Sequence, residues 1–311
     1  MMPALKPAEE YGLEPDALPL AQRRVADFIA LTKPRVVTMV MLTTLLGYYL
    51  GATEGSFDWL RVAITLLGTS LAASGTMALN QYLERDLDAR MLRTRQRPLP
   101  DGRLAPWDAL VFGSALTVVG VLVLLLAINS LSAVVTAVTS VSYLFAYTPL
   151  KPRTSLCTLV GAVPGALPPL TGWAAASGDL SPAAWAIFAI MFIWQIPHAL
   201  AIAQMYRDDY ARAGFRLLPV VDPDGSSTTR QILTYSLALL SVGMLPTLLG
   251  LAGPVYFVAS IILGLGLLAA SLRLARSSKT ADARRLMLAS LLYLPCLLAI
   301  MAADKLPASP W

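Results

Sequence analysis

Charged residues are scarce in this chain of 311 residues: Asp, Glu, Lys and Arg make up 14% of it, whereas a soluble domain carries about 25%. Cysteine is also scarce, and the two cysteines, Cys157 and Cys296, both lie in apolar stretches. We therefore expect neither a disulfide framework nor a thiolate metal site. The first 20 residues are polar, acidic and Pro-rich, and they lack the basic start and apolar core of a signal peptide. These scarcities argue against a soluble enzyme.

Apolar sequence is what the chain has in abundance. Hydrophobic residues make up 56%, the mean hydropathy is +0.63, and the apolar runs are long enough to cross a bilayer as helices. We identify nine such segments, near residues 28–50, 59–83, 107–127, 130–149, 155–176, 182–206, 231–251, 254–274 and 283–303. The sequence thus predicts an all-α integral membrane protein with nine transmembrane helices.

Positive charge is distributed unevenly between the links that join these segments. When the links are assigned alternately to two sides, every Lys and Arg except Arg61 and Lys305 falls on one side. Cytoplasmic links carry the excess of Lys and Arg in membrane proteins. The pattern predicts a cytoplasmic N-terminus and an external C-terminus, and it accounts for the net charge of +5 without nucleic acid as a partner.

We divide the chain into a disordered cytoplasmic tail (1–24), a membrane domain (25–304) and a C-terminal tail (305–311). The membrane domain carries a repeated pattern: Lys33-Pro34-Arg35 precedes the first segment and Lys151-Pro152-Arg153 precedes the fifth. The second and sixth segments, in turn, both end in acidic residues. This predicts an internal repeat, about 28–127 and 151–251. Six Gly and Pro residues between 161 and 172 predict a kinked, cavity-lining fifth segment.

Two acidic segment ends are candidate metal sites. Asn80, Glu84 and Asp88 recur every fourth residue, so on a helix their oxygens share one face. Such oxygen ligands suit Mg²⁺, which usually also binds phosphate oxygens. At the other end, Asp208 and Asp209 are adjacent and cannot both face one site, and we favour Asp209.

Basic and aromatic residues flank both acidic ends. The candidate diphosphate-binding residues are Lys33, Arg35, Arg93, Arg97, Lys151 and Arg153, although topology and snorkelling are the alternative reading. The candidate cation-pocket residues are Tyr147, Tyr206 and Tyr210, with Tyr82, Tyr143 and Trp194 possible by position. Metal, diphosphate and an apolar bundle together suggest ionisation of an allylic diphosphate in a dry pocket.

The single histidine, His198, lies inside the sixth segment. Ionisable residues within a membrane are functional candidates by default. His198 could ligate an iron, accept a proton or form only a hydrogen bond across the bundle.

Several motifs carry a family resemblance. Asn80-x-x-x-Glu84-x-x-x-Asp88, followed by Arg93-Thr-x-x-Arg97-Pro, resembles the first motif of the UbiA superfamily of intramembrane prenyltransferases. The motifs Tyr147-Thr-Pro-Leu-Lys151, Pro197-His198 and Tyr206-Arg-x-Asp-Asp-Tyr210 resemble its protohaem IX farnesyltransferase branch. The superfamily's second motif is usually Asp-x-x-x-Asp, but tyrosines stand at both positions here, which leaves the ligands of a second metal open.

The resemblance implies nine helices around a central cavity. The distribution of Lys and Arg places the acidic ends, and so the active site, on the cytoplasmic side, and we expect the protein in the cell inner membrane. The resemblance implies Mg²⁺ as cofactor, with farnesyl diphosphate and haem b as substrates and haem O and diphosphate as products. It implies catalytic roles for Asn80, Glu84, Asp88, Asp209 and His198. Besides the lipid bilayer, the candidate partners are a haem O hydroxylase (haem A synthase) and terminal-oxidase assembly factors.

Two alternatives remain at this stage. One is a prenyltransferase of the same superfamily that acts on an aromatic quinone precursor. The other is a membrane transporter, since transporters share internal repeats and broken helices. The acids lie at segment ends rather than near mid-membrane, which favours an enzyme.

Overall fold

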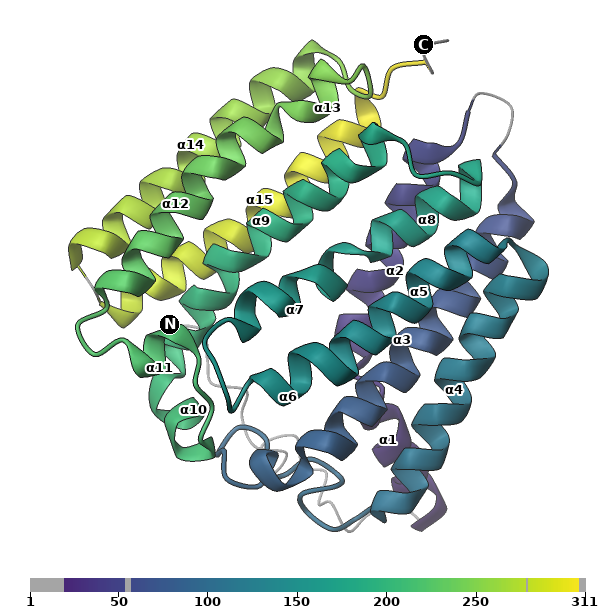
Figure 1. The fold of residues 1–311 in the computed structure, drawn as a ribbon, viewed down its shortest axis with the longest axis vertical. Helices are drawn as coiled ribbons and strands as arrows, with labels where there is room; N and C mark the ends of the chain where they lie inside the picture. Colours follow the sequence, from purple (N-terminus) through teal and green to yellow (C-terminus); the bar gives the residue numbers. More distant parts are fainter. Residues whose placement is uncertain (1–19, 54–56, 278, 308–311) are drawn as a thin grey trace.

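The computed structural model describes residues 20–53, 57–277 and 279–307, and these residues are almost entirely helical (Figure 1). Within them the only β-type pairing is an isolated antiparallel bridge between Ala252 and Lys305. The disorder predicted for residues 1–19 lies outside the described residues. Residues 20–24 of the predicted tail are helical, because α1 begins at Leu20.

Fifteen α-helices and one π-helix follow one another along the described chain. They are α1 (Leu20–Leu31), α2 (Pro34–Gly51), α3 (Trp59–Asp88), α4 (Pro106–Ala127), α5 (Ser130–Val141), the π-helix η3 (Ser142–Tyr147), α6 (Thr148–Leu150), α7 (Cys157–Ala166), α8 (Pro168–Ser177), α9 (Pro182–Met205), α10 (Arg207–Ala213), α11 (Leu218–Val221), α12 (Ser226–Gly243), α13 (Leu245–Leu248), α14 (Pro254–Ser277) and α15 (Thr280–Ala303).

Helix length and composition support fewer spans than the nine predicted. Among the described residues, seven helical stretches are long and apolar enough to cross a membrane, or eight if the bent pair α1–α2 counts as one span. Each of the nine apolar segments is nevertheless helical over most of its length. The differences arise where the first and fifth segments are interrupted.

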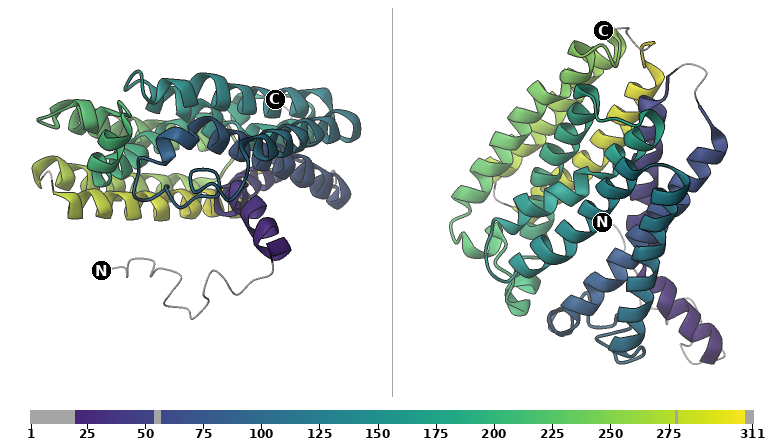
Figure 2. Two further views of the ribbon diagram at one scale, coloured as in Figure 1. Left: turned by 90° about the horizontal axis from the view of Figure 1, so that it is seen from below. Right: turned by 45° about the vertical axis from the view of Figure 1, so that its right-hand side comes forward.

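The first segment is interrupted by Lys33, which adopts a left-handed conformation with φ of 50° between α1 and α2. The residue before a proline is pushed out of the α region, and Pro34 starts the new helix α2. The two helices meet at a bend of 49°, and Figure 2 shows α1 standing away from the bundle. The first apolar segment, near residues 28–50, is therefore formed by two helices that meet at a bend.

The fifth segment is interrupted as its Gly and Pro content predicted. Helix α7 ends at Ala166, and α8 starts at Pro168, two residues later. Prolines lack the N–H that an uninterrupted helix needs and clash with the preceding turn. The predicted kink is confirmed.

Glycine contacts hold α8 against α2. A Cβ atom at Gly47 would lie 1.9 Å from the Pro169 carbonyl oxygen, and a Cβ at Gly172 would lie 1.9 Å from the Thr44 carbonyl oxygen. Each helix therefore brings its backbone against a glycine of the other, which is the way in which small residues allow close helix packing in membranes. This contact fixes the broken segment beside α2.

The two predicted halves pack their helices in the same order. In the first half α2 packs on α3, α3 on α4 and α4 on α5, while in the second half α7 packs on α9, α9 on α12 and α12 on α14. Helix α15 packs against α9 and α14 and also contacts α2. Helix α2 also packs extensively on α8, and the internal repeat stays a prediction.

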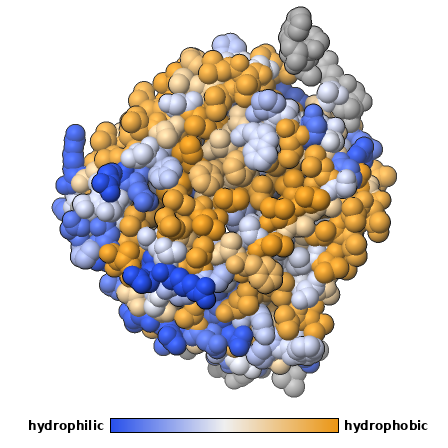
Figure 3. Space-filling view, in the orientation of Figure 1, coloured by the Kyte–Doolittle hydropathy of each residue, from blue (hydrophilic) through white to orange (hydrophobic). Residues whose placement is uncertain are grey.

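Much of the hydrophilic surface on the visible face lies at the end of the molecule that carries α10 and α11, with a smaller group at the upper right (Figure 3). Figure 3 shows hydrophobic residues over the middle of the visible face and hydrophilic residues along its lower and left edges, the end at which α10 and α11 lie in Figure 1. There the loop after α3 packs on the segment after α10, with Met91, Ala213 and Phe215 forming a small buried cluster. Segments more than a hundred residues apart therefore meet at this end.

Candidate active site

The last turns of α3 place three oxygen-bearing side chains on one buried face. Asn80, Glu84 and Asp88 are 1%, 5% and 1% exposed, although charged residues are rarely buried unless they are paired. The shared face predicted from their spacing is confirmed. Each of the three accepts a hydrogen bond from a different cationic side chain.

Asn80 joins two segments across the bundle. Its Oδ1 accepts a hydrogen bond from Lys33 Nζ at 2.9 Å, and its Nδ2 donates to Thr148 Oγ1 at 3.1 Å. Thr148 Oγ1 donates in turn to the Tyr143 carbonyl oxygen at 2.8 Å. The interruption between α1 and α2 thus brings the Nζ atom of Lys33 to the start of the acid row.

Glu84 forms a buried ion pair with Lys151. Lys151 Nζ donates to Glu84 Oε1 at 2.6 Å, and the ammonium lies 4.5 Å from the centre of the Tyr147 ring and 5.8 Å from that of Phe215. Burial by itself acts to lower the pKa of Lys151, but Tyr147 and the Glu84 carboxylate outweigh burial and raise that pKa above its ordinary value. Lys151 therefore carries its full charge at neutral pH.

Asp88 closes the row at the end of α3. Its Oδ2 accepts a hydrogen bond from Arg97 at 2.6 Å, and its backbone carbonyl accepts one from Thr94 Oγ1 at 2.8 Å. These contacts fold the arginine-rich loop back over the helix end. A charge-assisted bond of this length is among the stronger hydrogen bonds in proteins.

The second acidic end contributes one carboxylate to the same region. Asp209 is buried and accepts hydrogen bonds from the Leu92 amide at 3.0 Å and from Arg212 at 2.5 Å, whereas Asp208 is exposed. Burial acts to raise the pKa of Asp209, but these donated bonds outweigh it and hold that pKa below its ordinary value. The Leu92 contact ties α10 directly to the loop that follows the acid row.

Two tyrosines of α10 and its N-cap surround Arg93 of that loop. The guanidinium lies 5.4 Å from the ring centre of Tyr206 and 5.8 Å from that of Tyr210, and it donates to the Tyr210 hydroxyl at 3.3 Å. The structure therefore brings the two predicted motifs together.

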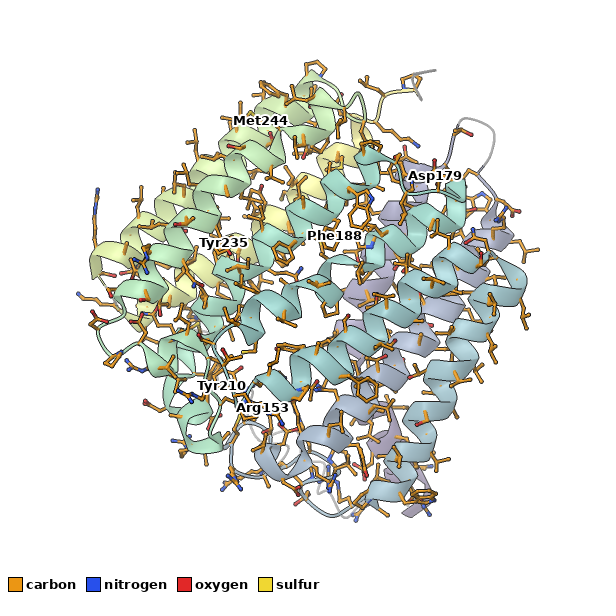
Figure 4. All side chains as sticks on the ribbon, in the orientation of Figure 1. Arg153, Asp179, Phe188, Tyr210, Tyr235 and Met244 are labelled. Atoms are coloured by element: carbon orange, nitrogen blue, oxygen red, sulfur yellow. The ribbon has the colours of Figure 1, made fainter. Side chains whose placement is uncertain are left out.

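Two predicted diphosphate ligands stand outside the ion-pair cluster. Arg35 and Arg153 are exposed, and neither forms an ion pair with a residue that the structure describes. Figure 4 shows Arg153 at the same end of the molecule as Tyr210, with Asp179 at the opposite end. The basic tripeptides therefore each contribute their lysine, and not their arginine, to the row.

A cavity of about 370 Å³ lies behind the acid row, a size typical of small-molecule sites. Residues from α2, α3, α5, η3, α7, α8, α9 and α15 line it. Thr76 and Met77 belong to its wall and precede Asn80 by about one helical turn. The row thus continues the wall of the chamber, and Gly165 and Pro168 in that wall confirm that the kinked segment lines the cavity.

Two tyrosines of the π-helix η3 connect the cavity to the row. Tyr143 lines the cavity, and its ring centre is 5.1 Å from that of Tyr147, which carries the Lys151 ammonium on its face. π-helical turns are frequent at functional sites. His198, from α9, also lines the chamber and is hydrogen-bonded to Ser290.

The described residues contain no group of three His, Cys, Asp or Glu side chains arranged to hold a metal ion on their own. The row offers only oxygen ligands, which suit Mg²⁺. Metals that prefer sulfur ligands find none in the row. Because Mg²⁺ is commonly held by one or two carboxylates together with substrate phosphates, the donor set fits this ion without an all-protein cage.

Sequence reasoning missed three contributors to the site. Thr148 lies inside a motif that was recognised, but its role as an Asn80 partner depends on η3. Phe215, beside Lys151, and Ser290, beside His198, carry no local signal because each is brought there by packing between distant segments.

Comparison with known proteins agrees with this geometry. Residues 40–294 match the model of the UbiA prenyltransferase family. A relative from Solibacter usitatus, named protoheme IX farnesyltransferase, is 48% identical over 90% of this chain and 98% of its own length. Another of the same name, from Koribacter versatilis, is 44% identical over 90% of this chain and 93% of its own.

Solved structures show the same fold. A UbiA homolog from Archaeoglobus fulgidus bound to GPP and Mg²⁺ has a TM-score of 0.62 at 15% identity, covering 89% of this chain and 99% of that chain. The likeness in fold extends along the whole bundle, and the family match covers both acidic ends. The chain is thus a member of the UbiA prenyltransferase family.

Proposed function

We propose that this protein transfers the farnesyl group of farnesyl diphosphate to a vinyl group of haem b, giving haem O and diphosphate. The observation that carries the proposal is the buried row of Asn80, Glu84 and Asp88, bonded to basic side chains, at one end of a largely apolar cavity. Relatives at 44–48% identity that are named protoheme IX farnesyltransferase support the choice of donor and acceptor.

The negative charges of the row are nearly balanced by basic side chains of the protein itself. Such a site suits a diphosphate that binds together with Mg²⁺ as its counter-ion. Glu84 and Asp88 pair with Lys151 and Arg97, and Lys33 is bonded to the neutral Asn80. A diphosphate that binds together with Mg²⁺ lets the cations turn to phosphate oxygens and the acids turn to the metal. Bound there, Mg²⁺ would be held by Asn80, Glu84, Asp88 and Asp209 and would neutralise charge that develops on the leaving group.

The chain's cations and aromatics act on the two sides of the breaking bond. Lys33, Lys151 and Arg97 stabilise the diphosphate as the carbon–oxygen electron pair leaves with it. Tyr143 and Tyr147 face the region where the allylic cation forms and can stabilise it through their rings. The vinyl group then donates its π electrons to the farnesyl carbon, and a water that loses one proton completes the hydroxyethylfarnesyl group. The apolar chamber keeps other water away.

The same proposal includes the membrane arrangement. Nine crossings, with the N-terminus and the acid row on the cytoplasmic side of the cell inner membrane, are supported by the one-sided distribution of Lys and Arg. The repeated packing order supports duplication of residues 28–127 as 151–251. A haem O hydroxylase and terminal-oxidase assembly factors remain proposed partners.

The test is product analysis with purified protein, Mg²⁺, farnesyl diphosphate and haem b. We expect haem O by mass, and we expect Asp88→Ala to abolish it while the protein remains folded. Asp86→Ala is the matched control, because the Asp86 side chain is 80% exposed on the same helix. Unmodified haem together with prenylation of 4-hydroxybenzoate would show that the acceptor is a quinone precursor. Full activity of Asp88→Ala would show that the acid row takes no part in the reaction.

A further inference from the structure

His198 lines the cavity, and the proposed function gives it no role, whereas Tyr143, the other titratable residue of that lining, has one. His198 lies on α9, half-buried, in the same wall as Trp194 and Gln195. None of the acids or cations of the row forms a hydrogen bond with it among the described residues. A role for His198 therefore has to be read from its own contacts.

The contacts of Ser290, on α15, decide which ring nitrogen of His198 carries the proton. Ser290 Oγ donates its single hydrogen to the Met287 carbonyl oxygen at 2.7 Å. It lies 2.7 Å from His198 Nδ1, and a hydroxyl that has already donated can only accept. Nδ1 is therefore the protonated nitrogen, and Nε2 keeps its lone pair in the neutral ring.

Ser290 also fixes the plane of the ring. Trp194 stacks on His198 with ring centres 5.0 Å apart and 17° between the planes, and Trp194 Nε1 donates to the Ser290 carbonyl oxygen at 2.8 Å. Both stacked rings are thus hydrogen-bonded to one residue of the neighbouring helix. This arrangement holds the imidazole in a single orientation.

The Nε2 atom is the free end of this arrangement. It has no hydrogen-bond partner among the described residues, and it is not among their fully buried unpaired atoms, so it reaches the surface of the cavity. A neutral imidazole whose other nitrogen donates a hydrogen bond is the usual form of a metal-ligating histidine. A planar metal macrocycle offers such a lone pair a partner in an otherwise apolar chamber.

We propose that His198 Nε2 is an axial ligand to the iron of the haem substrate, and that Ser290 is the positioning residue that sets its tautomer and orientation. The proposal rests on the proposed function, because that function supplies an iron macrocycle. Anchoring the iron at the α9–α15 side holds the macrocycle by its centre. Its vinyl groups, at the edge of the ring, are then free to face the acid row on α3.

The test is an absorption and electron paramagnetic resonance titration of the full-length purified protein with ferric haem b. We expect wild-type protein to give a histidine-ligated spectrum and His198→Ala to lose it, with affinity weakened about tenfold or more. Added imidazole should restore the spectrum of His198→Ala. Metal-free protoporphyrin IX should bind wild type and His198→Ala equally, because it has no iron to ligate. Gln195→Ala, from the same wall, is the matched control and should keep the wild-type spectrum.

Ser290 is tested by the same spectrum. Ser290→Ala should weaken haem affinity about tenfold, as loss of the partner of a metal-ligating histidine does, and Ser290→Thr should restore it. Identical haem spectra in wild type and His198→Ala would overturn the inference. If those spectra agree while product formation falls, His198 acts as a proton acceptor instead. If the wild-type protein makes haem O, an overturned inference about His198 leaves the proposed function standing. If the wild-type protein makes no haem O, the proposed function itself is wrong.

Discussion

The ion pair between Lys151 and Glu84 is the most direct test of how the acid row is built. Lys151→Met removes the ammonium and keeps a similar apolar stem, which leaves a carboxylate whose side chain is 6% exposed. Removing one partner of a buried pair costs roughly 3–5 kcal/mol, because the remaining charge stays buried without compensation. Since the Lys151 side chain is itself 14% exposed, we expect the lower end of that range, about 3 kcal/mol.

A second substitution separates stability from chemistry. Adding Glu84→Gln removes the unpaired charge, so the double variant should recover most of the lost stability. Transfer should remain reduced about 10²- to 10³-fold, because a preorganised cation has been lost from the proposed diphosphate site. The measurements are the unfolding midpoint of the purified protein and the initial rate of product formation. Unchanged stability of Lys151→Met, or recovered transfer in the double variant, would refute the reasoning.

The pH dependence of this pair follows from the direction of the Lys151 pKa. That pKa is raised, so the stability that the pair contributes is fully present below the ordinary lysine value of 10.5 and is lost only as the pH rises through the higher folded value. The difference in stability between wild type and Lys151→Met should therefore stay constant between about pH 6 and 9. A difference that disappears within this window would mean that Lys151 is neutral in the folded protein.

Three further predictions concern other parts of the molecule. Asp209→Asn should lower transfer about tenfold or more, because it weakens the charge-assisted bonds to the Leu92 amide, in the loop after α3, and to Arg212, in α10. The exposed Asp208→Asn should change the free energy of unfolding by less than about 0.5 kcal/mol. Equal effects of the two substitutions on transfer would contradict this assignment. Gly47→Ala should destabilise the bundle by about 1–3 kcal/mol through overpacking on Pro169, whereas Gly266→Ala, which meets nothing within 4 Å, should be neutral in a thermal unfolding assay. Chelation by EDTA should stop transfer and added Mg²⁺ should restore it in the product assay; transfer that persists after chelation would remove the metal.

Local periodicity was sufficient to predict the acid row at the centre of the site. It was insufficient to predict which basic side chains contact the row. The spacing of Asn80, Glu84 and Asp88 predicted one shared face, because helical side chains four residues apart stack on the same side. The same reasoning grouped Arg35 with Lys33 and Arg153 with Lys151, although only the lysines reach the row. Which member of a basic tripeptide turns inward depends on the local break in the helix, and the left-handed backbone at Lys33 was not anticipated.

The sequence by itself determined that this chain is a helical membrane protein with an acidic, oxygen-rich row where α3 ends, because hydropathy and four-residue spacing are local properties. Tertiary structure alone decided which basic side chain meets which member of the row, that Asp209 and not Asp208 is buried beside the loop of the first motif, and that His198 on α9 lies within hydrogen-bond distance of Ser290 on α15. Except for the local Arg97–Asp88 pair, which joins residues nine positions apart, those outcomes depend on contacts between residues about 50 to 120 positions apart. Such long-range contacts exist only once the helices have packed.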